Sequence, residues 1–284
     1  MKIPPKQNSL VNKIDAAVKE NTDNKPRPHL GASLIGHNCR RWLWLSFRWC
    51  IQEEFEGRIL RLFRRGQNEE EAIVSDLRAA GIVIDAEEEG KQYRVNLLPH
   101  FSGSMDGIIR SGVPESPNKP HVAEFKTHSK KSFDDLVKNG VEKSKPQHYA
   151  QMQTYMLGTD IDRALYVAVC KDDDRYYTER VKFDVNAAMK LKLKAEQIIF
   201  TDRLPEPLST RPDWYECKFC AAYKFCHQKD VSLIKKNCRS CAYSSATNDG
   251  GFRCHKHNGD IPLKYQYEGC GDYEMNEDLV YETS

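Results

Sequence analysis

Hydrophobic and polar positions follow one another along the chain in blocks that predict both helices and strands. Residues 56–80 carry apolar side chains at helical spacing and end at Gly81, so we expect a long amphipathic helix there. Apolar runs of strand length follow at 82–86 and 92–97, and again near residues 106 and 124. Further on, the pattern predicts helices from Ser132, from Pro146 and over 185–202, and strands over 163–170 and 176–183.

The two ends of the chain lack this pattern. Residues 1–30 are polar and rich in proline, with a short helix expected only at 14–18. A proline-rich stretch at 205–212 precedes a region rich in cysteine. We therefore expect a flexible N-terminal arm (1–30), a main domain (31–230) and a small C-terminal module (231–284).

Charge and hydropathy limit the classes of function that the chain can have. Among 284 residues, 43 are Lys or Arg and 41 are Asp or Glu, so a nucleic-acid partner is allowed but not demanded. No apolar run reaches the roughly 18 residues of a membrane span, and the first residues lack the apolar core of a signal peptide. These features predict a cytoplasmic protein, bacterial or, if the chain is viral, in the host cytoplasm.

The ten cysteines favour bound metal, because disulfides are rare in the cytoplasm. Cys217, Cys220 and Cys226 fall within ten positions, one thiolate short of the four that an iron–sulfur cluster or a structural zinc requires. Cys39 is the natural fourth ligand. Both a cluster and zinc remain open at this point.

A second cysteine set lies closer to the C-terminus. Cys238 and Cys241 form a C-x-x-C pair, and Cys254 and Cys270 follow in turn-rich sequence. This spacing indicates a small tetrahedral zinc module. His255 and His257 are substitute ligands, and the alternative is four free thiols.

The strongest candidate for chemistry is a predicted hairpin. One strand follows Asp106, turn-forming residues fill 111–120, and the second strand carries Glu124 and Lys126. Because side chains alternate along a strand, Glu124 and Lys126 share a face, and the partner strand brings Asp106 beside them. Two carboxylates favour Mg²⁺ or Mn²⁺, and a neighbouring lysine orients or deprotonates an attacking water. The alternative is an exposed Glu–Lys pair on an edge strand.

Two predicted helices add polar side chains to this candidate site. Glu70 lies in the long helix, where it either faces the metal or belongs to a solvated acidic turn. Gln151 and Tyr155 lie four residues apart on the helix that begins at Pro146. They are either simply exposed or hold a DNA strand beside the metal.

These motifs, taken in order, resemble the PD-(D/E)xK nuclease superfamily, and specifically its RecB-like iron–sulfur branch, which includes the AddB nuclease domain and CRISPR-associated adaptation exonucleases. Gly66-x-x-x-Glu70, Met105-Asp106-Gly107, Glu124-Phe125-Lys126 and Gln151-x-x-x-Tyr155 resemble the four family motifs. Cys39 with Cys217, Cys220 and Cys226 is similar to the split cluster of this branch. The chain departs from the family in lacking a proline before Asp106 and in carrying the Cys238–Cys270 module.

The resemblance implies an α/β fold in which helices flank a mixed sheet that a 4Fe–4S cluster closes. It also implies a DNA exonuclease of recombination, repair or viral DNA metabolism, with a recombination or replication protein as a further partner. Asp106, Glu124 and the Phe125 carbonyl would hold Mg²⁺ or Mn²⁺ with support from Glu70, Lys126 would position the water, and Gln151 and Tyr155 would orient the strand. The rival interpretations are an inactive module that binds DNA ends and a zinc-dependent regulatory or scaffold protein.

Overall fold

The computed structural model describes residues 9–23 and 25–280 and is built around a mixed five-stranded sheet. Its strands are β2 (Val83–Asp85), β7 (Gly107–Ser111), β8 (His121–His128), β9 (Arg163–Cys170) and β10 (Tyr176–Lys182). Their order is β10-β9-β8-β7-β2, and β8 with β9 is the one parallel pair among them. The predicted α/β architecture with a mixed central sheet is therefore present.

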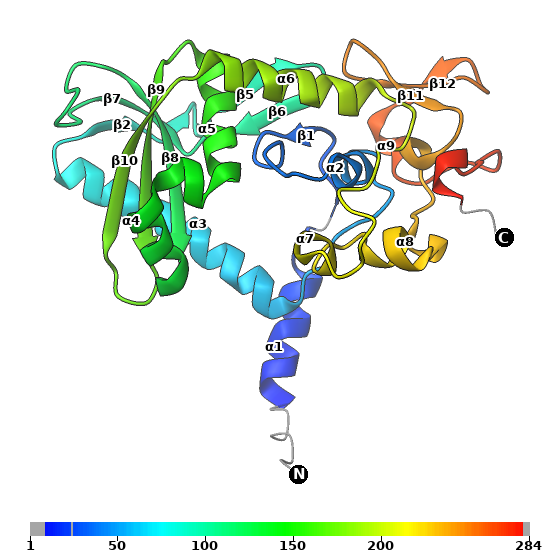
Figure 1. Cartoon of the computed structure of the whole chain (residues 1–284), viewed down its shortest axis with the longest axis horizontal. Helices are drawn as coiled ribbons and strands as arrows, with labels where there is room; N and C mark the ends of the chain where they lie inside the picture. Colours follow the sequence, from blue (N-terminus) through cyan, green and yellow to red (C-terminus); the bar gives the residue numbers. More distant parts are fainter. Residues whose placement is uncertain (1–8, 24, 281–284) are drawn as a thin grey trace.

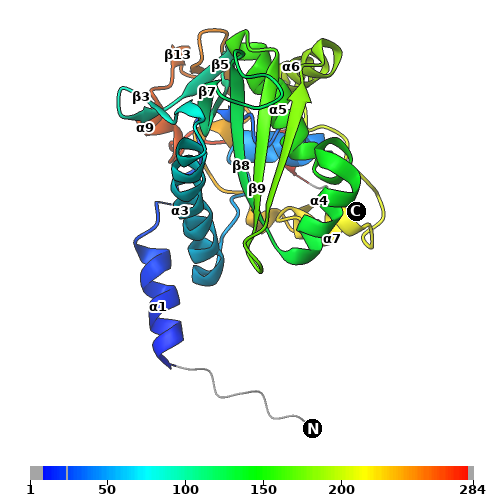
Figure 2. The same ribbon diagram turned by 90° about the vertical axis from the view of Figure 1, so that its left-hand side faces the viewer.

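Helices cover both faces of this sheet. Helix α3 (Gly57–Ala79) lies against one face, and α4 (Lys130–Ser144) and α5 (Pro146–Thr159) lie against the other (Figures 1 and 2). Phe125 of β8 packs toward α3 with Ile73 and Val167. A second apolar cluster, on the α5 side, includes Met152 and Tyr166. The sheet is thus buried on both faces, as its apolar strands require.

The bounds of α3 to α6 agree with the sequence pattern except at the start of α4 and the end of α6. α3 and α5 begin within a residue of the predicted positions, and Asp184 caps α6 (Val185–Phe200) by accepting bonds from two backbone N–H groups at 2.9 and 3.0 Å. α6 ends two residues before the expected residue 202. α4 begins before the predicted cap Ser132, because β8 turns directly into it through Ser129. The Ser132 hydroxyl instead lies 3.1 Å from His128 Nδ1.

Short strands that precede β7 form two further small sheets. A second sheet has the order β1-β6-β5, and the β3–β4 pair forms a small ribbon. The predicted strand at 92–97 corresponds to β5. β1 was not predicted, because its two residues are too few to form a pattern. The strands are β1 (Leu30–Gly31), β3 (Glu87–Glu88), β4 (Lys91–Gln92), β5 (Arg94–Leu98) and β6 (Phe101–Ser104).

The remaining elements are short and belong to the two ends of the chain. α1 is longer than the helix expected at 14–18, and it packs on α3, where Asp15 pairs with Arg61. In Figure 1, α1 extends away from the body of the molecule. These elements are α1 (Ser9–Glu20), α2 (Arg40–Phe47), α7 (Tyr215–Lys218), α8 (Tyr223–Gln228), η1 (Val231–Leu233), η2 (Cys238–Ser240), β11 (Ser244–Ala246), β12 (Phe252–Cys254), β13 (Gly259–Asp260), α9 (Leu263–Gln266) and η3 (Glu277–Leu279).

Two buried arginines join α2 to the C-terminal region. Arg48, which follows α2, donates to the carbonyl of Ser244 at 3.0 Å and pairs with Asp202. Arg239 donates to the carbonyl of Phe47 at 3.1 Å, and its guanidinium lies 3.7 Å from the ring centroid of Trp49. Each arginine is at most 2% exposed. The end of α2 and the C-terminal region therefore share one hydrogen-bonded core.

Within the described ranges, none of the helices combines the length and apolar character needed to cross a membrane.

Candidate active site and metal centres

The β7–β8 hairpin brings two carboxylates and an ammonium together. Asp106 immediately precedes β7, and its Oδ2 accepts a bond from the Phe125 N–H at 2.7 Å. Lys126 Nζ pairs with Glu124 Oε1, lies 3.9 Å from Asp106 Oδ2 and donates to the Phe125 carbonyl at 2.9 Å. Glu124 is fully buried, whereas the Lys126 side chain is 25% exposed. The site therefore has buried carboxylates and a lysine whose side chain is partly exposed.

Strand register explains this convergence. Gly107 pairs with Ala123, so the residue before Gly107 lies beside Glu124 on the neighbouring strand. Phe125 points into the core against α3, which places Glu124 and Lys126 on the opposite face. A Cβ on Gly107 would lie 2.8 Å from the Asp85 carbonyl oxygen, and φ is +157°. Glycine therefore lets the hairpin pass close to β2 at this point.

Burial dominates the electrostatics of the site. Lys126 is the one ion-pair partner of Glu124 among the described residues, and burial outweighs its charge and raises the pKa of Glu124 to about 8. Burial and then the charge of Asp106 raise the pKa of Glu70, on α3, to about 7. Burial also raises the pKa of Asp106, although the ammonium of Lys126 opposes it. The acidic groups are thus poised to exchange protons for a cation.

Lys126 itself stays charged. Burial alone would lower the pKa of Lys126, but the carboxylates of Glu124 and Asp106 together raise it above its ordinary value. The ammonium therefore donates hydrogen bonds and does not accept a proton at neutral pH.

Gln151 and Tyr155 lie inside the protein, bonded to the backbone that carries Asp106. The Tyr155 hydroxyl donates to the Ser104 carbonyl at 2.5 Å and accepts a bond from Gln151 Nε2 at 3.0 Å. A Cβ on Gly103 would lie 2.6 Å from the Tyr155 ring. In this structure the pair holds the segment before Asp106 in place.

Three further side chains near the site were not predicted from the sequence. The Tyr166 hydroxyl lies 2.8 Å from His128 Nε2 and 2.9 Å from His148 Nδ1. Burial, followed by the charges of nearby lysines, lowers the pKa of His128 to about 4 and that of His148 to about 3. The one feature of the sequence that could have indicated these residues is the position of His148. It lies three residues before Gln151 and therefore on the same helix face.

The first cysteine set gathers around one cavity. Cys39, at the N-cap of α2, lines a small cavity together with three cysteines from α7, α8 and their connection. Burial raises the pKa of all three, to about 11 for Cys220, so their ionisation requires a cationic group. These three are Cys217, Cys220 and Cys226.

The spacing of these thiols is wider than one zinc ion requires. Tetrahedral zinc with Zn–S bonds of about 2.3 Å places sulfur atoms roughly 3.8 Å apart. Over residues 9–23 and 25–280, the one set of three metal-ligand atoms within 4.8 Å of one another is that of His257, Cys270 and Asp272. The same holds for Cys238, Cys241, Cys254 and Cys270, so the spacing does not distinguish a cluster from a single ion at either cysteine set.

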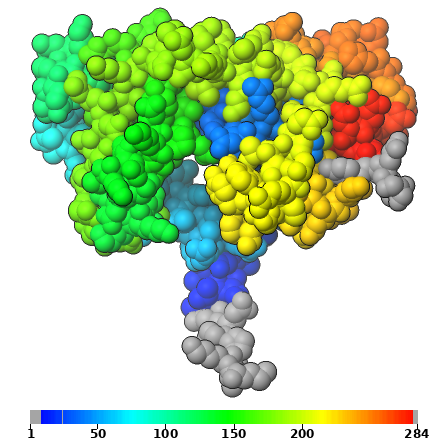
Figure 3. Space-filling model, viewed as in Figure 1, coloured from blue at the N-terminus to red at the C-terminus, as the bar shows by residue number. Residues whose placement is uncertain are grey.

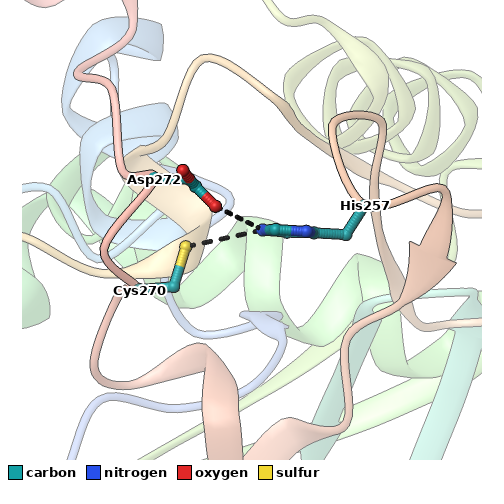
Figure 4. Close-up of side chains that lie close together, drawn as sticks. All are labelled: His257, Cys270 and Asp272. Atoms are coloured by element: carbon teal, nitrogen blue, oxygen red, sulfur yellow. Dashed lines mark hydrogen bonds and ion pairs between the residues drawn. The ribbon is translucent and has the colours of Figure 1, made fainter.

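In the second cysteine set, the four thiols are more widely spaced than the ligands of a bound zinc ion. Burial, followed by the charges of Cys270, Cys241 and Cys254, raises the pKa of Cys238 to about 11, which places the four thiols in one neighbourhood. Figure 4 shows Cys270 facing His257, whose Nε2 lies 3.9 Å from Cys270 Sγ and 3.3 Å from Asp272 Oδ2. His257, the predicted substitute ligand, thus lies beside the last cysteine. His255 instead bonds to the Ser245 hydroxyl at 2.7 Å.

Comparison with known proteins gives distant structural likenesses. No family model matches the chain, and no curated protein matches its sequence. An alkaline exonuclease from Laribacter hongkongensis is 18% identical with a TM-score of 0.45, covering 66% of this chain and 90% of its own. The protein SSO0001 is 18% identical with a TM-score of 0.46 (78% and 97% covered). A phage-related exonuclease from Haemophilus somnus 129PT is 20% identical with a TM-score of 0.34 (46% and 66% covered). These values are too low to assign a family.

Proposed function

We propose that this protein is a metal-dependent deoxyribonuclease that hydrolyses phosphodiester bonds at DNA ends. The observation that carries the proposal is the fully buried Glu124 carboxylate, which lies beside Asp106 and has Lys126 as its one ion-pair partner among the described residues. Two buried carboxylates that share one ammonium leave a negative charge uncompensated when both are ionised, and a bound cation would neutralise it. The order of the four sequence motifs, similar to that of PD-(D/E)xK nucleases, supports hydrolysis of DNA.

The donor set fits a hard divalent cation. Asp106 and Glu124 would bind Mg²⁺ or Mn²⁺ through carboxylate oxygens, with the Phe125 carbonyl and Glu70 as further oxygen donors. When bound, the cation supplies charge stabilisation to the phosphate under attack and to the leaving oxygen.

Each remaining residue has a separate task in the proposed reaction. Lys126, held by Glu124 and the Phe125 carbonyl, donates a hydrogen bond that orients the attacking water. The Tyr155 hydroxyl and the Gln151 amide keep the backbone before Asp106 fixed. His128 and His148 stay neutral at working pH, so they contribute hydrogen bonds and no added charge.

The test is digestion of end-labelled single- and double-stranded DNA with Mg²⁺ or Mn²⁺, comparing wild type with Asp106→Asn. We expect metal-dependent loss of label by the wild type and no digestion by the variant, which has similar volume but a weaker metal ligand. DNA binding without digestion by metal-loaded wild type would favour the inactive end-binding module. Equal digestion by both proteins would place the active site elsewhere.

Metal binding is expected to strengthen as the pH rises from 6 to about 8. In the metal-free protein the pKa of Glu124 is about 8 and that of Glu70 about 7, so at pH 7 a bound cation must displace about one proton or more. Calorimetric titration with Mg²⁺ in buffers of different ionisation enthalpy measures this release. Glu70→Gln should reduce the number of protons released, and identical affinity at pH 6 and pH 8 would contradict the assignment.

We also propose that the two cysteine sets hold different metals. A 4Fe–4S cluster bound by Cys39, Cys217, Cys220 and Cys226 would tie the segment before α2 to α7 and α8 within the nuclease domain (31–230). Zinc bound by Cys238, Cys241, Cys254 and Cys270 would stabilise the module 231–284, with His257 able to replace Cys270.

A further inference from the structure

Four side chains beside Lys126 form a continuous chain of hydrogen bonds. The Tyr166 hydroxyl lies 2.8 Å from His128 Nε2 and 2.9 Å from His148 Nδ1, and the Ser132 hydroxyl lies 3.1 Å from His128 Nδ1. We call Ser132, His128, Tyr166 and His148 the histidine–tyrosine chain. His148 is half-buried, and its other ring nitrogen, Nε2, has no hydrogen-bond partner among the described residues. The chain therefore ends on an atom that can bind a ligand.

The histidine–tyrosine chain lies on the face of the sheet that carries the carboxylates. Tyr166 of β9 is paired in register with Glu124 of β8. His128 follows Lys126 by two positions on β8, so both point to the same face as Glu124. Helix α5, which carries His148, packs on this face, and the α4–α5 segment borders an opening in the surface of the molecule (Figure 3).

His148 is a close neighbour of Lys126. After burial, the charge of the Lys126 ammonium contributes most to lowering the pKa of His148. The Lys126 side chain is itself 25% exposed, so solvent and solutes reach this part of the sheet. A phosphate that approaches Lys126 therefore also approaches the imidazole of His148.

The hydroxyl proton of Tyr166 determines which nitrogen of His148 carries a proton. A neutral imidazole has one N–H, and a hydroxyl donates one hydrogen bond. When Tyr166 donates to Nδ1 of His148, the ring proton of His148 is on Nε2. Tyr166 then accepts from Nε2–H of His128, and the Ser132 hydroxyl donates to Nδ1 of His128. In the opposite direction the chain would end on a lone pair, which repels the oxygens of a phosphate.

We propose that His148 donates its Nε2–H to a non-bridging oxygen of the phosphodiester under attack, and that Tyr166 and His128 are positioning residues that keep the proton on Nε2. The inference rests on the proposed nuclease function and adds a hydrogen-bond donor to that site. Negative charge builds up on these oxygens during the attack, and a donor that is already in place stabilises it. Because the donor is neutral, it does not compete with a cation for Asp106 and Glu124.

Nitrogen NMR of the protein labelled with ¹⁵N-histidine measures the tautomer directly and needs no substrate. The signals of His148 are identified by their absence from the spectrum of His148→Gln. We expect the Nε2–H form of His148 in the wild type at pH 7. Tyr166→Phe, which keeps the ring and removes the hydroxyl, should show a mixture of both tautomers. The Nδ1–H form in the wild type would overturn the proposal.

Single-turnover digestion of end-labelled DNA at saturating Mg²⁺ measures what the donor contributes to the rate. His148→Ala should lower the rate by about 10²-fold or more, the usual loss for one donor to developing charge. His148→Gln places an amide N–H near the former Nε2 and should recover part of this loss. Tyr166→Phe should lower the rate by roughly ten-fold, as for other partners that orient a functional imidazole.

Tyr176→Phe is the matched control for the loss of a hydroxyl. The Tyr176 hydroxyl donates to Asp76 of α3 at 2.7 Å. Tyr176 is paired in register with Val169, which packs on the α3 face of the same sheet. This variant should digest DNA at the wild-type rate. An equal loss in Tyr176→Phe and Tyr166→Phe would show that the effect is not specific to the histidine–tyrosine chain and would overturn the proposal.

The melting temperature separates a structural role from the proposed one. A lower melting temperature with an unchanged rate in His148→Ala would overturn the inference, because the imidazole would then only join α5 to the sheet. That result, with Asp106→Asn inactive, leaves the proposed nuclease function in place. Lack of digestion by the wild type would contradict the nuclease function itself, and the tautomer of His148 would still be measurable.

Discussion

Lys126→Ala is expected to slow metal-dependent DNA hydrolysis by about 10²- to 10⁴-fold, the usual contribution of a positioned proton-transfer or water-orienting group. Lys126 is the one cation in contact with both Glu124 and Asp106 among the described residues, and its side chain reaches solvent where a water can bind. The loss should appear in the rate of single-turnover digestion, with Mg²⁺ binding retained because both carboxylates remain.

Lys190→Ala on α6 is a suitable control, since this lysine is exposed and lies outside the site. It should digest DNA at the wild-type rate. Circular dichroism should show Lys126→Ala to be folded, because Glu124 already has a raised pKa and holds its proton when the ammonium is removed. Unimpaired digestion by folded Lys126→Ala would show that β8 does not carry the catalytic group.

Cys217→Ser is expected to abolish the brown colour of the iron-loaded protein and lower its melting temperature by on the order of 10 °C. The cluster would link Cys39 to α7 and α8 across most of the chain, and a cross-link that closes a loop of 100 residues or more contributes about 4–5 kcal/mol. Visible absorbance, iron content and thermal unfolding measure the effect.

Cys254→Ser provides the reciprocal control for this variant. It should lose zinc and retain iron, whereas Cys217→Ser should lose iron and retain zinc. Iron content unchanged in Cys217→Ser would contradict the cluster assignment. Loss of both metals in both variants would show that the two cysteine sets are not independent sites.

Local sequence signals predicted much of the fold. The apolar stripe of α3, Pro146 at the start of α5 and the turn between β7 and β8 each act within a few residues, so they are readable without tertiary information. Strand alternation was also sufficient to place Glu124 and Lys126 on one face. The proximity of Asp106 then followed from hairpin pairing.

Features that depend on contacts distant in sequence were not predictable in the same way. Arg48 and Arg239 read as ordinary charged residues, yet both are buried because backbone carbonyls from the other end of the chain accept their hydrogen bonds. The Tyr155 hydroxyl was expected to face DNA, whereas it bonds to the Ser104 carbonyl, a contact set by the packing of α5 on β5 and β6. Whether it also orients substrate stays a prediction.

The position of α2 has a consequence for how the chain folds during synthesis. This eight-residue helix, about 12 Å long, has Cys39 at one end and Arg48 at the other. The cysteines that share the cavity with Cys39 lie at 217–226 and the partners of Arg48 at 201–244, so neither end is complete until the last part of the chain has left the ribosome. Domains usually fold as their residues emerge. Here the segment around α2 must wait for the last part of the chain, so the cavity at Cys39 is completed late in synthesis or after it.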